Sequence, residues 1–103
     1  NMIDYKITRA MQVNDGQIRA TVRFYRGTVA TQNEQLFDNF GPITRYRRSE
    51  MIAERSFRVP PESTMQQMKL KINRRLQRLA QQLGEMVVPE QQQTADDADM
   101  IDD

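Results

Sequence analysis

Residues 3–25 read IDYKITRAMQVNDGQIRATVRFY, and this stretch decides the fold. Apolar and polar side chains alternate on both sides of Asp15-Gly16, which is the period of a β-strand with one buried face. Asp-Gly is also a strong signal for the two-residue turn that joins antiparallel strands. The stretch therefore predicts a β-hairpin whose two apolar sets share one face. The expected cross-strand pairs are Val13 with Ile18, Met11 with Ala20, and Ile7 with Phe24.

Residues 45–59 are expected to return to the sheet as one strand or two, because their side chains alternate again. Ile52 interrupts the alternation, so residues 49–55 are also compatible with the start of a helix. Residues 30–44 contain Gly-Pro and a polar run, which predicts a projecting loop between the hairpin and this strand. The apolar side chains of one parity are Met51, Ala53, Phe57 and Val59.

The residues after Pro60-Pro61 carry the clearest helical pattern. Ser63 followed three residues later by Gln66 is a capping box, which predicts the start of a helix, and Pro89 limits its end. The apolar stripe of this helix is short for a coiled coil, and a three-stranded sheet needs its apolar face covered. We therefore expect the stripe to pack on the sheet. It consists of Met65, Met68, Ile72, Leu76, Leu79, Leu83 and Met86.

Together these patterns predict one α+β domain over residues 1–89. It is a small antiparallel sheet of three or four strands that starts with the N-terminal hairpin and is covered by one C-terminal amphipathic helix. A chain of 103 residues has room for a single domain. Residues 90–103 are expected to form an acidic C-terminal tail or arm. One sheet face and one helix stripe make a modest core, and a domain this thin often relies on a partner.

The composition argues against an enzyme. The chain has no His and no Cys, so the common nucleophilic triads, thiolate chemistry and the usual zinc ligands are missing. Its four glycines stand singly and form no phosphate-binding loop. We therefore expect no catalytic or metal-ligating residue, no cofactor and no small-molecule substrate. No stretch approaches the ~20 apolar residues of a membrane span, and residues 1–4 lack the features of a signal peptide.

Charge is distributed unevenly along the chain. Residues 90–103 carry six of the 14 acidic residues and no cation, whereas residues 1–89 carry all 15 cations. Twelve of these cations are Arg, whose planar guanidinium suits carboxylates, phosphates and buried interfaces. A disordered segment that aids solubility explains the acidic end. An arm that binds a basic surface explains it equally well.

Two basic surfaces are candidate binding sites for protein or phosphate. One lies on the polar face of the predicted sheet, and the other follows the outward side of the helix. A solvated surface explains either one, but basic surfaces of this kind also bind phosphate backbones or acidic proteins. The candidate residues are Arg19, Arg23, Tyr25 and Arg58 on the sheet, and Lys71, Arg74, Arg75 and Arg78 on the helix.

Three further arginines, Arg9, Arg26 and Arg55, share the parity of the apolar side chains in the predicted sheet. In a monomer their stems would pack at the sheet margin with the charged heads in water. Alternatively, they contact the acidic segment of a neighbouring subunit through charge-assisted hydrogen bonds. The acidic candidates for this inter-subunit contact are Asp96, Asp97, Asp99, Asp102 and Asp103.

The order of hairpin, loop, strand and late helix, in IRATVRFYRGTV and SFRVPPESTMQQMKLKINRRLQRLAQQL, resembles the small accessory virion proteins of tailed bacteriophages. That resemblance implies a structural or assembly protein of a virion or the host-cell cytoplasm, with copies of itself or other assembly proteins as partners. The basic body with its acidic tail DDADMIDD is also similar to single-stranded-DNA-binding proteins. This second resemblance implies a nucleic-acid-binding accessory protein whose tail regulates access.

Overall fold

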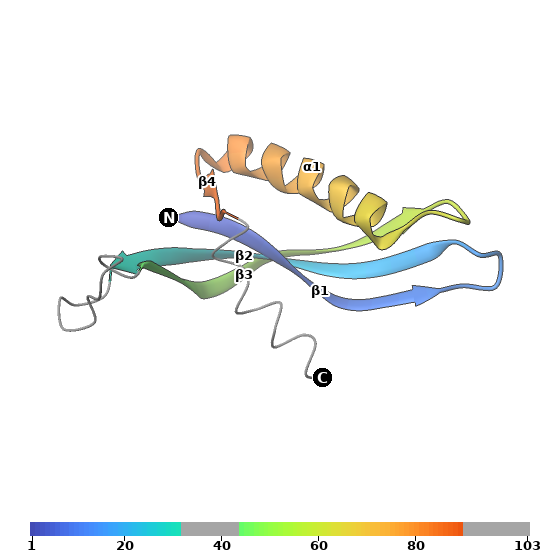
Figure 1. Cartoon of the computed structure of the whole chain (residues 1–103). Helices are drawn as coiled ribbons and strands as arrows, with labels where there is room; N and C mark the ends of the chain where they lie inside the picture. Colours follow the sequence, from blue (N-terminus) through green and yellow to red (C-terminus); the bar gives the residue numbers. More distant parts are fainter. Residues whose placement is uncertain (32–43, 90–103) are drawn as a thin grey trace, which may run out of the picture.

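The polypeptide forms a four-stranded sheet with one helix across it, in a computed structural model that describes residues 1–31 and 44–89 (Figure 1). The strands are β1 (Met2–Gln12), β2 (Ile18–Thr31), β3 (Thr44–Val59) and β4 (Met86–Val87), and the helix is α1 (Met65–Leu83). The order across the sheet is β3-β2-β1-β4. β1, β2 and β3 are antiparallel neighbours, as predicted, whereas the short β4 runs parallel to β1. The α+β architecture expected from the sequence is therefore confirmed, with a mixed sheet.

The hairpin is present, but its predicted register is wrong. The turn has three residues rather than two, because Gly16 adopts a left-handed backbone (φ 87°) and donates its amide to the Val13 carbonyl at 2.8 Å. A left-handed Gly after a tight turn is the usual form of a three-residue hairpin loop. A bulge between Ile7 and Arg9 then shifts the pairing once more. The observed pairs are Gln12 with Ile18, Ala10 with Ala20, Ile7 with Val22, and Tyr5 with Phe24.

This register decides which side chains reach the core. Ile7 pairs with Val22 and both are buried, so the apolar faces still coincide over the first half of β1. Beyond the bulge the alternation of β1 is reversed, and Met11 lies opposite Arg19 on the face away from the helix. Met11 is 43% exposed, which contradicts its predicted place in the core.

Residues 44–59 form one continuous strand, so a split into two strands or a helical start at residues 49–55 is not observed. Ile52 and Ser49 are the extra residues at two bulges, because Phe24 pairs with Ala53 while Tyr25 pairs with Met51. A bulge reverses the alternation in the longer strand. Met51 is consequently 52% exposed, on the face opposite to the buried Phe57 and Val59. The predicted loop at residues 30–44 lies outside the described residues except at its ends, which belong to β2 and β3.

The helix begins one residue later than its predicted capping box indicates. Thr64 is the N-cap, and it exchanges hydrogen bonds with Gln67 through both side chains, at 3.1 Å and 2.8 Å. Gly84 ends the helix with a left-handed backbone (φ 67°), which is favourable for Gly. The chain then returns to the sheet, where the Val88 amide donates to the Ile3 carbonyl. Met86 therefore belongs to β4, and at 71% exposure it is not part of the buried stripe.

The core lies between α1 and one face of the sheet. Met68, Ile72, Leu76 and Ala80 of the helix are buried against apolar side chains of β1, β2 and β3. Phe24 and Phe57 meet edge to face, with ring centroids 6.2 Å apart, a favourable aromatic arrangement. The opposite face of the sheet, here called the outer face, has no second layer over it among residues 1–31 and 44–89. No helix in this part of the chain is long and apolar enough to span a membrane.

Candidate binding surfaces

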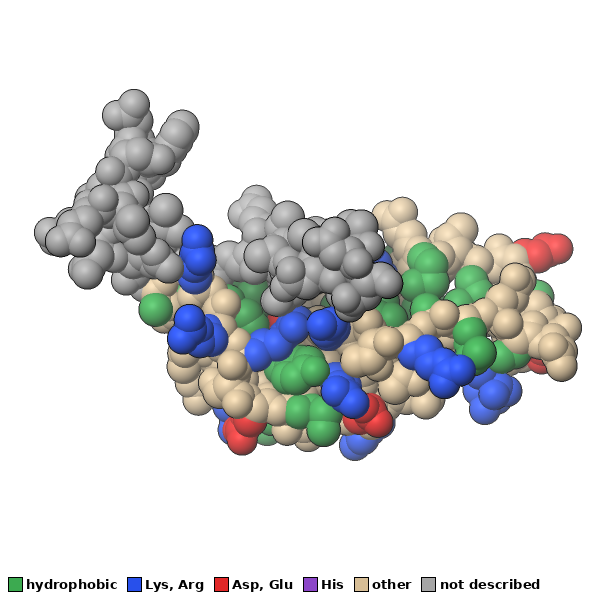
Figure 2. All heavy atoms as spheres, turned by 90° about the horizontal axis from the view of Figure 1, so that it is seen from below, with side chains coloured by type: hydrophobic (Ala, Val, Ile, Leu, Met, Phe, Trp, Pro, Cys, Tyr) green, Lys and Arg blue, Asp and Glu red, His purple; other side chains and the backbone are tan. Residues whose placement is uncertain are grey.

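The outer face is rich in Arg and Lys. The cross-strand register assigns its side chains to rows that cross β1, β2 and β3, and Figure 2 shows the positive side chains spread along it with apolar side chains between them. Alternation along the strands positions these groups, because successive side chains point to opposite faces. The rows are Met11, Arg19 and Arg58; Arg9, Thr21 and Ser56; Lys6, Arg23 and Glu54; and Asp4, Tyr25 and Met51.

Three arginines gather at the hairpin end of the outer face. Arg19 and Arg58 are directly opposite each other in neighbouring strands, and Arg9 lies in the next row. The bulge in β1 moves Arg9 to this face, so its predicted place on the apolar side is wrong. None of the three forms an ion pair within the described residues. Like charges opposed across strands destabilise a sheet, so this cluster is suited to bind an anion.

Arg23 is engaged within the chain. Its Nε lies 2.8 Å from a carboxylate oxygen of Glu54 in the neighbouring strand. The hydrogen bond to Glu54 raises the pKa of Arg23 above its usual value. Both side chains are about half exposed. Arg23 therefore contributes less positive charge to a binding surface than Arg19 or Arg58.

The centre of the outer face holds a buried carboxylate that the sequence did not reveal. Asp4 is fully buried and accepts a hydrogen bond from the Tyr46 hydroxyl at 2.8 Å. It also accepts two hydrogen bonds from Arg48, one from Nη2 at 2.6 Å and one from Nε at 2.9 Å. The Arg48 guanidinium also stacks over the Tyr25 ring, 4.6 Å from its centroid. Tyr25 is one of the binding residues that the sequence predicts, and Arg48 covers one face of its ring. Asp4 occupies a polar position of an alternating strand, and no local feature distinguishes it from a solvated residue.

Gly27 makes the approach of β3 to this cluster possible. A Cβ atom on Gly27 would lie 2.2 Å from the Arg47 carbonyl oxygen and 2.8 Å from a ring carbon of Tyr46. The absence of a side chain therefore lets the Tyr46 ring lie across β2 and reach Asp4. A glycine inside a strand often marks such a close approach.

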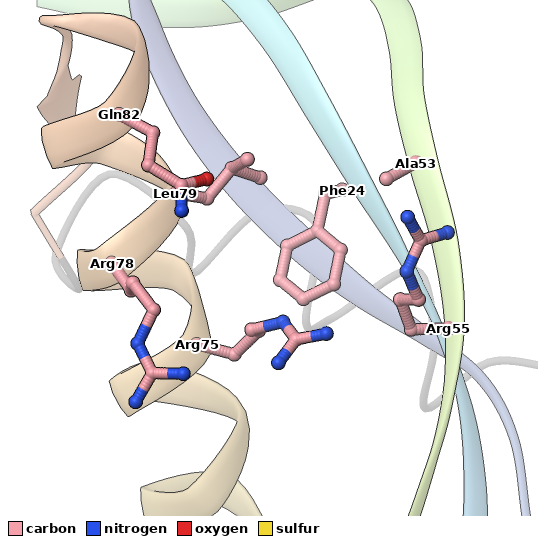
Figure 3. Close-up of a pocket in the computed structure, with 7 residues that line it drawn as sticks. All are labelled: Phe24, Ala53, Arg55, Arg75, Arg78, Leu79 and Gln82. Carbon is pink, nitrogen blue, oxygen red and sulfur yellow. The ribbon is translucent and has the colours of Figure 1, made fainter.

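A second basic site lies on the helix side of the sheet, in a cavity of about 270 Å³ between α1, β2 and β3. Figure 3 shows that the side chains of Arg75 from the helix and Arg55 from β3 both extend to the neighbourhood of the Phe24 ring. Arg75 and Arg78 form no ion pair within the described chain, and Arg55 donates only to the Glu54 carbonyl oxygen, at 2.7 Å. The lining residues are Phe24, Ala53, Arg55, Arg75, Arg78, Leu79 and Gln82, and this site is called the helix-side groove below.

The remaining predicted cations are separate from this groove. Lys71 donates to the Arg58 carbonyl oxygen, and Arg74 is exposed and does not line the cavity. Arg26 lies between Glu50 and Glu85, at 3.3 Å and 2.8 Å, and the pairing with Glu85 is the main cause that raises its pKa. Arg26 therefore forms ion pairs with two acids of its own chain.

The predicted acidic partners, Asp96 to Asp103, lie outside the described residues. Within the described part of the chain, no group of three or more His, Cys, Asp or Glu side chains is placed to hold a metal ion. Comparisons with known protein families, with curated proteins and with solved structures find no match to this chain.

Proposed function

We propose that this protein is a non-enzymatic assembly protein whose copies associate through the acidic C-terminal arm of one subunit and the basic body of the next. The resemblance of its layout to accessory virion proteins supports a role in a phage particle. The charge balance supports the same view, because the chain carries both halves of a complementary pair, a basic body and an acidic end.

The observation that carries the proposal is the excess of unpaired cations on the body. Residues 1–31 and 44–89 contain all 15 Lys and Arg residues, yet only Arg23, Arg26 and Arg48 form ion pairs within them. The acids that these three engage are Asp4, Glu50, Glu54 and Glu85, so only four of the eight acids of residues 1–89 remain for the twelve other cations. Six acids follow Pro89 without an intervening cation. A chain that separates its charges in this way is complementary to a second copy of itself, and a head-to-tail contact of this type propagates into rings or filaments.

The interface chemistry of the body also favours protein as the partner. Interfaces between proteins are enriched in Arg, Met and Tyr and depleted in Lys, and the outer face presents Met11 and Met51 among its arginines. β3 is an edge strand of 16 residues with no strand beyond it in the described structure. Such an edge offers backbone hydrogen bonds to an incoming chain.

The test is sedimentation of the full chain over a range of protein concentrations at low and high salt. We expect an oligomer that dissociates at high salt. Replacing the five aspartates of the arm by Asn should weaken association about fivefold or more, since five exposed ion pairs contribute ~0.2–1 kcal/mol each. Glu62→Gln removes an exposed acid of the body and serves as the matched control. A full chain that stays monomeric, or an Asn variant that associates as before, refutes the proposal.

A second candidate is an accessory protein that binds single-stranded nucleic acid. The cluster of Arg9, Arg19 and Arg58 favours it, because three unpaired guanidiniums suit a phosphate backbone. The aromatic side chains of the described residues favour it less: Phe24 and Phe57 are buried and Arg48 packs on Tyr25, so few rings in that part of the chain are open for base stacking.

The Asn variant of the arm separates the two candidates, because it should weaken self-association but strengthen binding to DNA. Fluorescence anisotropy with labelled single-stranded DNA is the assay. For a phosphate-binding protein, affinity should fall roughly 10³-fold between ~50 and ~200 mM salt if six or more phosphates are contacted. The absence of binding at low salt eliminates this candidate.

A further inference from the structure

The helix-side groove combines positive charge with an apolar floor. Arg55, Arg75 and Arg78 surround it, and no acidic residue among residues 1–31 and 44–89 lines it. Leu79 and Ala53, both partly buried, contribute the apolar surface, over the buried Phe24 ring that Figure 3 shows at the centre of the groove. A ligand that satisfies this site has carboxylate or phosphate groups on either side of an apolar group. The groove therefore suits a ligand that has both anionic and apolar groups, whereas the outer-face arginines require only an anion.

The size of the groove favours side chains over a free small molecule. Its volume of about 270 Å³ lies just under the ~300–1,000 Å³ of pockets that enclose small-molecule ligands. A recess of this size accepts one or two side chains of a bound peptide. The peptide backbone would remain outside, along the gap between α1 and β3.

The chain itself contains a segment of matching chemistry. Met100-Ile101 is the single apolar pair of the acidic arm, and it lies between Asp99 and Asp102-Asp103. Two apolar side chains flanked by carboxylates are complementary to an apolar floor flanked by guanidiniums. Met is also flexible and fills irregular recesses well.

We propose that the helix-side groove binds residues 99–103 of a second copy of this chain, with Met100 or Ile101 on Leu79 and Ala53 and the carboxylates on the three arginines. This inference rests on the proposed function and names the site at which the arm binds. It also assigns a role to Arg55, Arg75 and Arg78, which are not part of the arginine cluster at the hairpin end of the outer face.

The topology favours the arm of a second copy over that of the same chain. The arm follows β4, which lies at one edge of the sheet, whereas the groove is lined by α1, β2 and the opposite edge strand β3. At the C-terminal end of α1, Glu50 and Glu85 flank Arg26. An acidic segment of the same chain that crosses the sheet end would pass these two carboxylates, which repel it. The arm of a neighbour can approach the groove past the edge strand β3 and avoids these carboxylates.

The experiment is paramagnetic relaxation enhancement between differently labelled full-length copies. The chain has no cysteine, so Ala98→Cys provides a unique attachment site for a nitroxide. The nitroxide copy carries no ¹⁵N and is mixed with ¹⁵N-labelled chain that carries no nitroxide. Any broadening then reports a contact between two molecules. We expect selective loss of intensity at the amides of residues 53–55 and 75–82, which returns when the nitroxide is reduced.

Matched variants test the chemistry of the groove. Arg75→Gln with Arg78→Gln in the ¹⁵N copy should abolish the broadening, whereas Arg74→Gln, on the same helix but outside the groove, should preserve it. Met100→Ser with Ile101→Ser in the nitroxide copy keeps the charge and removes the apolar pair. This change should weaken the contact at least about tenfold, because the burial of an apolar side chain, worth ~1.5–3 kcal/mol, is lost.

The possible results separate the site from the function. Broadening at Arg9, Arg19 and Arg58 in the mixture would overturn the groove as the site and leave assembly through the arm intact. Broadening that occurs only when nitroxide and ¹⁵N are on one molecule would overturn the proposed function as well, since the arm would then bind its own body. No broadening in either sample overturns both.

Discussion

The buried carboxylate of Asp4 provides the sharpest test of how this sheet is held together. Asp4 is fully buried and the Arg48 side chain is 18% exposed, so their ion pair is largely removed from water. Asp4→Val should leave the Arg48 guanidinium and the Tyr46 hydroxyl without this acceptor. Breaking a buried pair by removal of one partner lowers the free energy of unfolding by ~3–5 kcal/mol. A small domain has ~5–15 kcal/mol in total, so this single change threatens the fold.

The double variant gives the decisive comparison. Arg48→Met alone should be similarly destabilising, because it leaves the Asp4 carboxylate buried without its guanidinium. Asp4→Val combined with Arg48→Met replaces the pair by apolar groups, a change that is often neutral. We therefore expect the double variant to be more stable than either single variant, with a coupling energy of ~3 kcal/mol. Urea denaturation followed by circular dichroism measures all four proteins, and equal m-values show that the comparison is valid.

An exposed ion pair on the same face is the control. Glu54→Gln removes the partner of Arg23, but both side chains are about half exposed. We expect its urea midpoint to stay close to that of the parent, as for most surface pairs. If Asp4→Val lowers the free energy of unfolding by less than ~1 kcal/mol, the carboxylate behaves like a surface group and the argument from burial fails.

Two further predictions concern the backbone. Gly27→Ala should destabilise the protein by ~1–3 kcal/mol or more, because the new Cβ would lie 2.2 Å from the Arg47 carbonyl oxygen. Thr28→Ala, at the exposed neighbouring residue, is the control and should change the free energy of unfolding by less than ~0.5 kcal/mol. If the two variants lower the melting temperature equally, the close approach of β3 to Gly27 is contradicted. Thr64→Ala should lower the free energy of unfolding by about 1 kcal/mol, because the helix loses its N-cap. Ser63→Ala should have little effect. If urea denaturation shows that Ser63→Ala is the more destabilising of the two, Ser63 is the N-cap.

The helix and the strands were predictable because their signals are local. The apolar residues of α1 recur at helical spacing, and four of its side chains are buried in the structure. Alternation identified β1, β2 and β3, and it assigned Arg19 and Arg58 to the polar face on which they lie. The capping box was misplaced by one residue, because Ser63-Thr64 offers two adjacent N-cap residues and the sequence does not choose between them.

The register was not predictable, because a tight turn with Asp-Gly is compatible with loops of two or three residues. Gly16 adopts the left-handed conformation of the longer loop, and bulges at Thr8, Ser49 and Ile52 then reverse the alternation. A bulge adds one residue to one strand only, so it is decided by packing across strands and leaves no reliable local pattern. For this reason Met11, Met51 and Arg9 lie on the face of the sheet opposite to the one that the sequence predicts.

The candidate sites also depend partly on features that the sequence shows and partly on packing that it does not. The sequence by itself determined that residues 1–89 are basic, that residues 90–103 are acidic and that the chain has no His or Cys, since these depend on composition alone. Only the tertiary structure decided which cations converge. Arg55 meets Arg75 and Arg78 because α1 crosses β3, and Asp4 is buried because β3 carries Tyr46 and Arg48 back to it from more than 40 positions along the chain. Contacts at that separation depend on how the strands and the helix pack, which no local pattern of residues specifies.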